Sequence, residues 1–130
     1  MNKTSFNILR VGLAITFLWI GILIFKDPEA WGGYMSQWVI DLLPMPVKEA
    51  MLGTAILDIA IGIFLLFDVF VWLAALVGAL HLVVVLAVTG ITDVTVRDVG
   101  ILAGVVALMI DSLPKNITDK ISSLKKENKI

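Results

Sequence analysis

Four long apolar stretches organise the chain, and three of the four are joined to a neighbour by only a few polar or turn-forming residues. They cover residues 6–25, 49–67, 71–89 and 94–113. A helix of about 20 apolar residues is long enough to cross a hydrocarbon core of about 30 Å. The pattern predicts an all-α integral membrane protein, in which four spanning helices form a four-helix bundle and a single domain over residues 1–113.

The longest connection joins the first two spans and carries tryptophan and tyrosine at helical spacing. It begins with the sequence DPE, which is typical of a helix N-terminus because aspartate caps a helix and proline suits its first turn. Trp31, Tyr34 and Trp38 follow, and these residue types concentrate at the membrane–water interface. We predict an amphipathic interfacial helix over residues 28–43.

Composition agrees with a membrane protein and excludes several functional classes. Hydrophobic residues make up 59% of the chain and charged residues 16%, against about 45–50% and about 25% in soluble domains. A net charge of -1 offers no basic surface for a nucleic acid. With no cysteine and one histidine, the chain alone has no thiol chemistry, cysteine metal site or bis-histidine haem. We expect no metal or haem cofactor.

Basic residues predict the orientation in the membrane. Residues 114–130 hold five lysines and form a basic tail that is either solvated or lies along a surface. Lys3 and Arg10 fall on the same side of the predicted bundle as the tail, and Lys26, Lys48 and Arg97 fall on the other. Since lysine and arginine accumulate on the cytoplasmic side, we predict a multi-pass protein of the cell membrane with both termini in the cytoplasm.

The middle of the second predicted span contains an acid, Asp58, and the middle of the third contains His81. A carboxylate at the bilayer centre costs about 2.5–3.5 kcal/mol on insertion scales, so it normally faces a partner or a wet cavity. A tight turn joins these spans, and the two residues lie about one helical turn apart in height, close enough to meet directly or through a water. The pair can relay protons or hydrogen-bond a ligand, or it can be a structural hydrogen bond. We treat both residues as candidate catalytic groups.

A second charged group lies at the opposite, predicted outer ends of the spans, and consists of Lys26, Glu49, Arg97 and Asp98. Flat apolar contacts from the loop aromatics would complete a ligand pocket there. The candidate ligand-binding residues are Lys26, Trp31, Trp38, Arg97 and Asp98. The alternative is an ion-pair network that satisfies charges at helix ends.

Arg10, near the cytoplasmic end of the first span, is predicted to act in architecture. It can reach Asp111 or Asp68, and we assign a structural ion pair between Arg10 and Asp111. Gly100 and Gly104 form a small-xxx-small pair in the fourth predicted span, and such pairs allow close helix approach. We predict that this face points into the bundle.

Three segments of the chain resemble the DoxX family and its DoxX-like relatives: LRVGLAITFLWIGILIFK, GTAILDIAIGIFLLF and VRDVGILAGVVALMID. The resemblance extends from Leu9 to Asp111. The positions that match the family pattern are Arg10, Asp58, Arg97 and Asp98, with His81 matching less firmly. The resemblance implies a small subunit of membrane redox systems linked to quinol oxidation, thiosulfate-to-quinone electron transfer or oxidative-stress complexes.

These features lead to one main hypothesis and two alternatives. The main hypothesis is a subunit of a quinone-linked oxidoreductase that binds a quinone or similar lipophilic ligand in the bundle and is inactive alone. Because cysteine is absent, electrons would move through the bound quinone or a partner's cofactor. We therefore expect a protein partner or a homo-oligomer in the lipid bilayer. The alternatives are a non-enzymatic scaffold that stabilises a partner and, more weakly, a small proton-coupled transporter.

Overall fold

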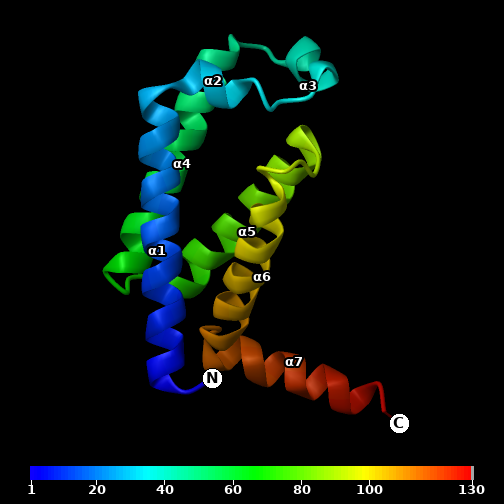
Figure 1. Cartoon of the computed structure of the whole chain (residues 1–130). Helices are drawn as coiled ribbons and strands as arrows, with labels where there is room; N and C mark the ends of the chain where they lie inside the picture. The colour runs from blue at the N-terminus through cyan, green and yellow to red at the C-terminus, as the bar shows by residue number, and fades with distance from the viewer. Residues whose placement is uncertain (130) are drawn as a thin grey trace.

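The computed structural model describes residues 1–129, and within them every regular element is a helix (Figure 1). The elements are α1 (Lys3–Lys26), α2 (Pro28–Gly32), α3 (Gln37–Leu42), α4 (Val47–Leu66), α5 (Val71–Thr89), α6 (Val96–Asp111) and α7 (Lys115–Glu127). The predicted all-α class is confirmed.

Three of the helices within residues 1–129, namely α1, α4 and α5, are long and apolar enough to cross a membrane. They correspond to the first three predicted spans. α1 begins before the predicted residue 6 because the Asn2 side chain accepts a hydrogen bond from the backbone N–H of Ser5 at 2.8 Å and caps the helix. α6 has 16 residues, about 24 Å of helix, which is shorter than a hydrocarbon core of about 30 Å.

The prediction of one helix over residues 28–43 is wrong, because the structure has two short helices, α2 and α3, separated by residues 33–36. α2 starts as predicted, with the Asp27 side chain accepting a hydrogen bond from the backbone of Ala30. The paired glycines at its end favour termination, and the chain then crosses to α5. There the backbone N–H of Ser36 donates to the carbonyl of Val88 at 2.8 Å.

α1 and α4 make the closest helix contact, and glycine makes it possible. A Cβ atom at Gly21 would lie 2.7 Å from the Ile59 side chain and 3.0 Å from the Ala55 carbonyl. One at Gly62 would lie 3.0 Å from the Ala14 carbonyl. The two backbones therefore approach through small residues, as helices do in membranes.

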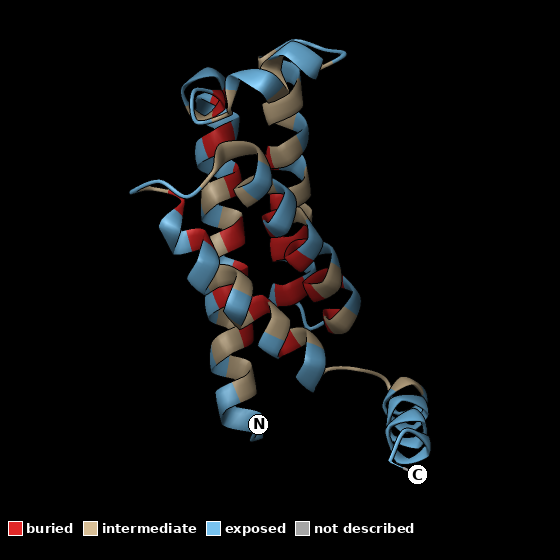
Figure 2. Ribbon diagram, turned by 90° about the vertical axis from the view of Figure 1, so that its right-hand side faces the viewer, coloured by how far each residue is buried: buried red, intermediate tan, exposed pale blue. Residues whose placement is uncertain are grey.

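The apolar core fills the space where α1, α4, α5 and α6 come together (Figure 2). Its fully buried large side chains are Leu65, Val105 and Leu108. From this core α5 and α6 diverge from α1 and α4 toward α2 and α3 (Figure 1). The arrangement is a bundle that is packed at one end and separated at the other.

The two glycines predicted to face the bundle from α6 differ. A Cβ at Gly104 would lie 3.5 Å from the Leu9 side chain, which belongs to α1, whereas a Cβ at Gly100 would have no atom within 4 Å. Gly104 therefore contacts the bundle as predicted. Gly100 does not, because α6 has already diverged from α1 at that height.

The predicted ion pair between Arg10 and Asp111 is also wrong. The Arg10 guanidinium donates hydrogen bonds to the backbone carbonyls of Leu65 and Leu66, and its Nε lies 3.6 Å from Asp68. Asp111 instead accepts from the α-amino group of Met1 at 3.0 Å. The two acids lie at different levels along the bundle axis. Arg10 lies at the level of the α4–α5 turn, whereas Asp111, at the end of α6, lies at the level of Met1.

Candidate functional site

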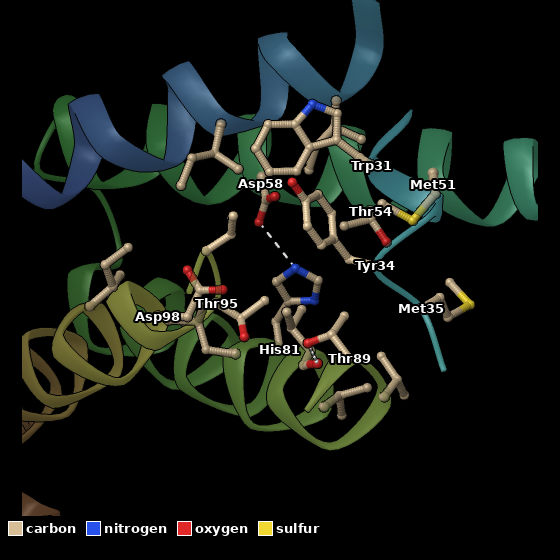
Figure 3. A pocket seen from close by; sticks show the side chains of 18 of the residues that line it. Trp31, Tyr34, Met35, Met51, Thr54, Asp58, His81, Thr89, Thr95 and Asp98 are labelled. Atoms are coloured by element: carbon tan, nitrogen blue, oxygen red, sulfur yellow. Dashed lines mark hydrogen bonds and ion pairs between the residues drawn. The ribbon is translucent and has the colours of Figure 1, made fainter. Parts of the chain in front are cut away.

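A cavity of about 280 Å³ lies where the helix pairs separate (Figure 3). Its walls come from α1 and α4 on one side and from α5 and α6 on the other. Residues 31–43 and the two residues before α6, Val94 and Thr95, contribute the remainder. Most of the lining is aliphatic or aromatic, and includes Phe17, Ile20, Ile24, Leu82, Val85, Val88 and Ile101. A mostly apolar cavity with a few polar groups is the usual form of a small-molecule site.

Asp58 and His81 meet on the cavity wall. The His81 Nε2 atom lies 3.1 Å from the Asp58 Oδ1 atom (Figure 3), and their side chains are only 11% and 6% exposed. Asp58 lies on the buried face of α4 with Ala55 and Gly62, so the small residues that bring α4 against α1 also hold this acid inside. Of the two arrangements expected, direct contact or contact through a water, the structure has the direct one.

The contact leaves one ring nitrogen of His81 free. The Nε2 atom is the ring nitrogen that faces the carboxylate, so we assign the proton of the neutral ring to Nε2. His81 Nδ1 has no hydrogen-bond partner within residues 1–129. In the neutral ring this atom is an acceptor. A ligand can therefore donate a hydrogen bond to His81 Nδ1. If it also transfers its proton to this atom, the Asp58 carboxylate on the other side of the ring stabilises the charged imidazole.

Arg97 and Asp98, at the start of α6, form the second charged part of the cavity. Asp98 is buried, and its Oδ1 lies 3.6 Å from the Arg97 Nε. The Arg97 guanidinium lies 5.5 Å from the centre of the Trp31 ring, within range of a cation–π interaction. This contact joins the loop between α1 and α4 to the start of α6, while the Arg97 side chain stays 44% exposed.

Threonine hydroxyls complete the polar lining, and three of them donate their hydrogen to the backbone rather than to the cavity. Thr54, Thr89 and Thr95 each donate to a backbone carbonyl four or five residues earlier in the chain, at 2.6–3.2 Å. The oxygens of Thr54 and Thr89 can therefore act as acceptors toward the cavity, whereas the Thr95 oxygen already accepts from the Thr92 N–H at 2.7 Å. With Asp58, Asp98 and the free nitrogen of His81, the inner wall is rich in hydrogen-bond acceptors.

The structure does not bring every predicted site residue to the cavity. Trp31, Asp58, His81, Arg97 and Asp98 line it, but Lys26 and Trp38 do not. Lys26 is exposed at the end of α1. Trp38 is 59% exposed, because α3 turns its neighbour Val39 toward the cavity instead.

Sequence reasoning missed lining groups that carry polar atoms, among them Thr89 and Thr95. Tyr34 was predicted, with the other loop aromatics, to contact a ligand, and it lines the cavity. Thr95 has a local signal in the sequence, since Thr92 and Thr95 form a hydrogen-bonded turn in which the Thr92 N–H donates to the Thr95 hydroxyl at 2.7 Å.

Within residues 1–129, no three acidic or histidine side chains are grouped as metal ligands.

Comparison with known proteins identifies the family. The family model described as DoxX matches residues 6–92, from α1 through the end of α5. The match includes Asp58 and His81 but ends before Arg97 and Asp98. Searches of curated proteins and of solved structures return no match. Because the matched segment covers well over half of its 130 residues, the chain belongs to the DoxX family of membrane proteins.

Proposed function

We propose that this protein is a membrane subunit of a quinone-linked redox complex, and that it binds a quinone or a similar lipophilic ligand in the cavity between its helix pairs. The observation that carries the proposal is the position of the Asp58–His81 pair on the wall of an otherwise apolar cavity. Buried ionisable groups in membrane proteins mark ligand and proton pathways.

The size and lining of the cavity favour one ring-sized apolar head group. Its volume of about 280 Å³ is close to the lower end of the range for small-molecule pockets, about 300–1,000 Å³. Aliphatic side chains from α1 and α5 would contact the faces of such a ring, and Trp31 and Tyr34 would contact its edge at the loop side. A ligand with a larger polar surface would leave its own groups unpaired against this lining.

The excess of acceptors on the inner wall favours the reduced form of the ligand. A quinol supplies two hydroxyl protons and two electrons when it is oxidised to the quinone. His81 Nδ1 accepts one hydroxyl hydrogen bond and then the proton, and Asp58 stabilises the resulting imidazolium. Asp98 is the second acceptor, beside Arg97. The electrons pass to a redox cofactor of a partner subunit.

The proposal includes a topology in which α6 is the fourth span and both termini are cytoplasmic. α6 packs along α5, and the Arg97 guanidinium at its start contacts the Trp31 ring. In this topology the 16 residues of α6 cross with the help of local bilayer thinning or flanking residues at its ends. A three-span topology would place the two termini on opposite sides.

The chain has no cysteine, so single cysteines can test this topology directly. Ser5→Cys, Gln37→Cys and Glu127→Cys variants are treated with a membrane-impermeant maleimide in intact cells. We expect labelling of Gln37→Cys alone. Labelling of Glu127→Cys without Ser5→Cys would remove α6 from the spans and overturn the topology.

Ligand content tests the functional proposal. The protein is purified in mild detergent from its native membrane, extracted with solvent and assayed by redox difference absorbance. We expect quinone in stoichiometric amount, and loss of most of it in His81→Ala, with Asp68→Asn as the control because Asp68 pairs with Arg10 outside the cavity. Absence of quinone with a constant co-purifying protein would contradict the proposal and favour the scaffold alternative.

A further inference from the structure

α7 is a helix that the bundle does not use. None of its residues, Lys115–Glu127, is buried. In Figure 1 it runs across the long axis of the bundle and away from it, and in Figure 2 it is seen nearly end-on, apart from the other helices. The redox proposal assigns it no role. Its direction is set at Pro114, which has no N–H and so cannot continue α6.

One face of α7 is apolar although nothing covers it. Ile117, Ile121 and Leu124 recur at intervals of four and three residues, which places them on one stripe of a helix. Ile121 is 52% exposed and Leu124 is 53% exposed. By the same helical spacing, Lys120 and Lys125 border the stripe on its two sides. Lysines in this position extend their charged heads past an apolar boundary while their stems remain in it.

The charge of the segment is strongly positive. Residues 115–129 hold five lysines and two acids, Asp119 and Glu127, which gives a net charge of +3. The whole chain has a net charge of -1, so the basic character is concentrated here. A basic segment beside a membrane is attracted to anionic lipids, with each lysine contributing separately.

The position of α7 places it at the boundary of the bilayer. The α-amino group of Met1 pairs with Asp111 at 3.0 Å, so the start of α1 and the end of α6 lie at one height. α1 is long and apolar enough to span, and its N-terminal end therefore lies near one membrane surface. A helix that leaves this point across the bundle axis runs parallel to that surface.

We propose that α7 lies in the plane of an anionic lipid surface, with the Ile117, Ile121 and Leu124 stripe in the boundary between head groups and acyl chains. Lys120 and Lys125 contact lipid phosphates on either side of the stripe. The remaining lysines face water above the head groups. Amphipathic helices with a basic polar face bind membranes in this way.

The test uses the full chain in lipid nanodiscs, with a spin label on either of two adjacent positions. Ile121→Cys reports from the apolar stripe, and Ser122→Cys is the matched control from the polar face. In discs of phosphatidylcholine with phosphatidylglycerol, we expect oxygen to relax the label at position 121 several-fold more than a water-soluble nickel complex does, with the reverse at position 122.

The lipid dependence tests the role of charge. In discs of phosphatidylcholine alone, or in the Lys120→Glu/Lys125→Glu variant in anionic discs, we expect the difference between the two positions to shrink. Equal access of the nickel complex to both positions in anionic discs would overturn the proposal. Spin–spin broadening at position 121 would also overturn it, if the broadening persists on dilution with unlabelled lipid and disappears on dilution with unlabelled protein. That result would show a second copy of the chain against the stripe.

Discussion

The bundle buries charged residues in two places, and the surroundings of these residues differ. At the packed end, Arg10 is buried, and its guanidinium donates to two backbone carbonyls at the end of α4 and lies beside Asp68. In the cavity, His81 and Asp98 keep atoms that no group within residues 1–129 hydrogen-bonds. Arg10 donates to its own chain, and its buried Nε atom has no hydrogen-bond partner within residues 1–129 and lies 3.6 Å from Asp68. The cavity groups instead line open space that a ligand can enter.

This contrast shows how a structural charge can be told from a functional one in a membrane protein. Both regions contain buried residues of the kinds that the bilayer disfavours. What differs is the space beside them: the Arg10 site is closed by the apolar core, and the Asp58–His81 site opens onto a cavity of about 280 Å³.

Removal of the Arg10 side chain is expected to have the largest effect on stability. Arg10→Ala leaves the Leu65 and Leu66 carbonyls without their charged donor, and hydrogen bonds to charged groups contribute about 1.5–3 kcal/mol each. We expect the free energy of unfolding to fall by about 3 kcal/mol, measured by thermal unfolding in detergent with the exposed Lys3→Ala as control. If the folded fraction of Arg10→Ala retains its quinone affinity, the Arg10 site is structural and separate from the cavity. If Arg10→Ala is as stable as Lys3→Ala, Arg10 does not have the structural role assigned to it.

Gly62 lies between the two regions, at the α1–α4 contact. Gly62→Ala places a methyl group 2.6 Å from the Leu18 side chain and 3.0 Å from the Ala14 carbonyl, and overpacking of this kind costs about 1–3 kcal/mol. We expect a stability loss of about 2 kcal/mol. Gly100→Ala is the control, since its new methyl group meets no atom within 4 Å and alanine favours a helix interior by about 0.5–1 kcal/mol. A loss in both variants would contradict the assigned contact.

Asp58→Asn is expected to affect the ligand more than the fold. The asparagine oxygen still accepts a hydrogen bond from His81, so the change in unfolding free energy should stay below about 1 kcal/mol. The loss of the negative charge behind the imidazole should weaken quinol binding about tenfold, or about 1.4 kcal/mol. Binding titrations of the reduced and oxidised ligands would measure this. An equal loss for both forms would argue against a role in accepting the hydroxyl proton.

Arg97→Ala is expected to have the smallest effect. It removes a cation–π contact of about 0.5–1 kcal/mol for a partly exposed pair, because the Arg97 side chain is 44% exposed. The loop that contains Trp31 should then exchange its amide hydrogens faster, while the packed end around Arg10 keeps its exchange rates. Hydrogen exchange with mass spectrometry would resolve the two regions, and Lys48→Ala is the control on the same side of the molecule.

The sequence was sufficient where local pattern and short-range geometry decide the outcome. α5 begins and ends as predicted, at Val71 and Thr89, because its apolar run is bounded by a tight turn and a glycine. The contact between Asp58 and His81 followed from the same turn, which makes α4 and α5 antiparallel neighbours and places the two residues at nearly the same height.

The sequence was insufficient where the outcome depends on how distant elements fit together. Arg10 had two possible acids, and the choice of Asp68 depends on the height at which α4 ends beside α1. The loop aromatics share one helical spacing, but the break between α2 and α3 sends Trp31 and Tyr34 to the cavity and Trp38 to the outside. No local pattern distinguishes these three side chains.

The hydrogen bond from the Ser36 N–H to the Val88 carbonyl attaches the loop over the cavity without using any side chain that lines it. It joins the loop to α5 through main-chain atoms, so any residue other than proline can form it. The side chains around it, Tyr34 and Met35, are then free to change without detaching the loop. Relatives with different residues at these positions would retain the same cover while altering which ligand fits beneath it.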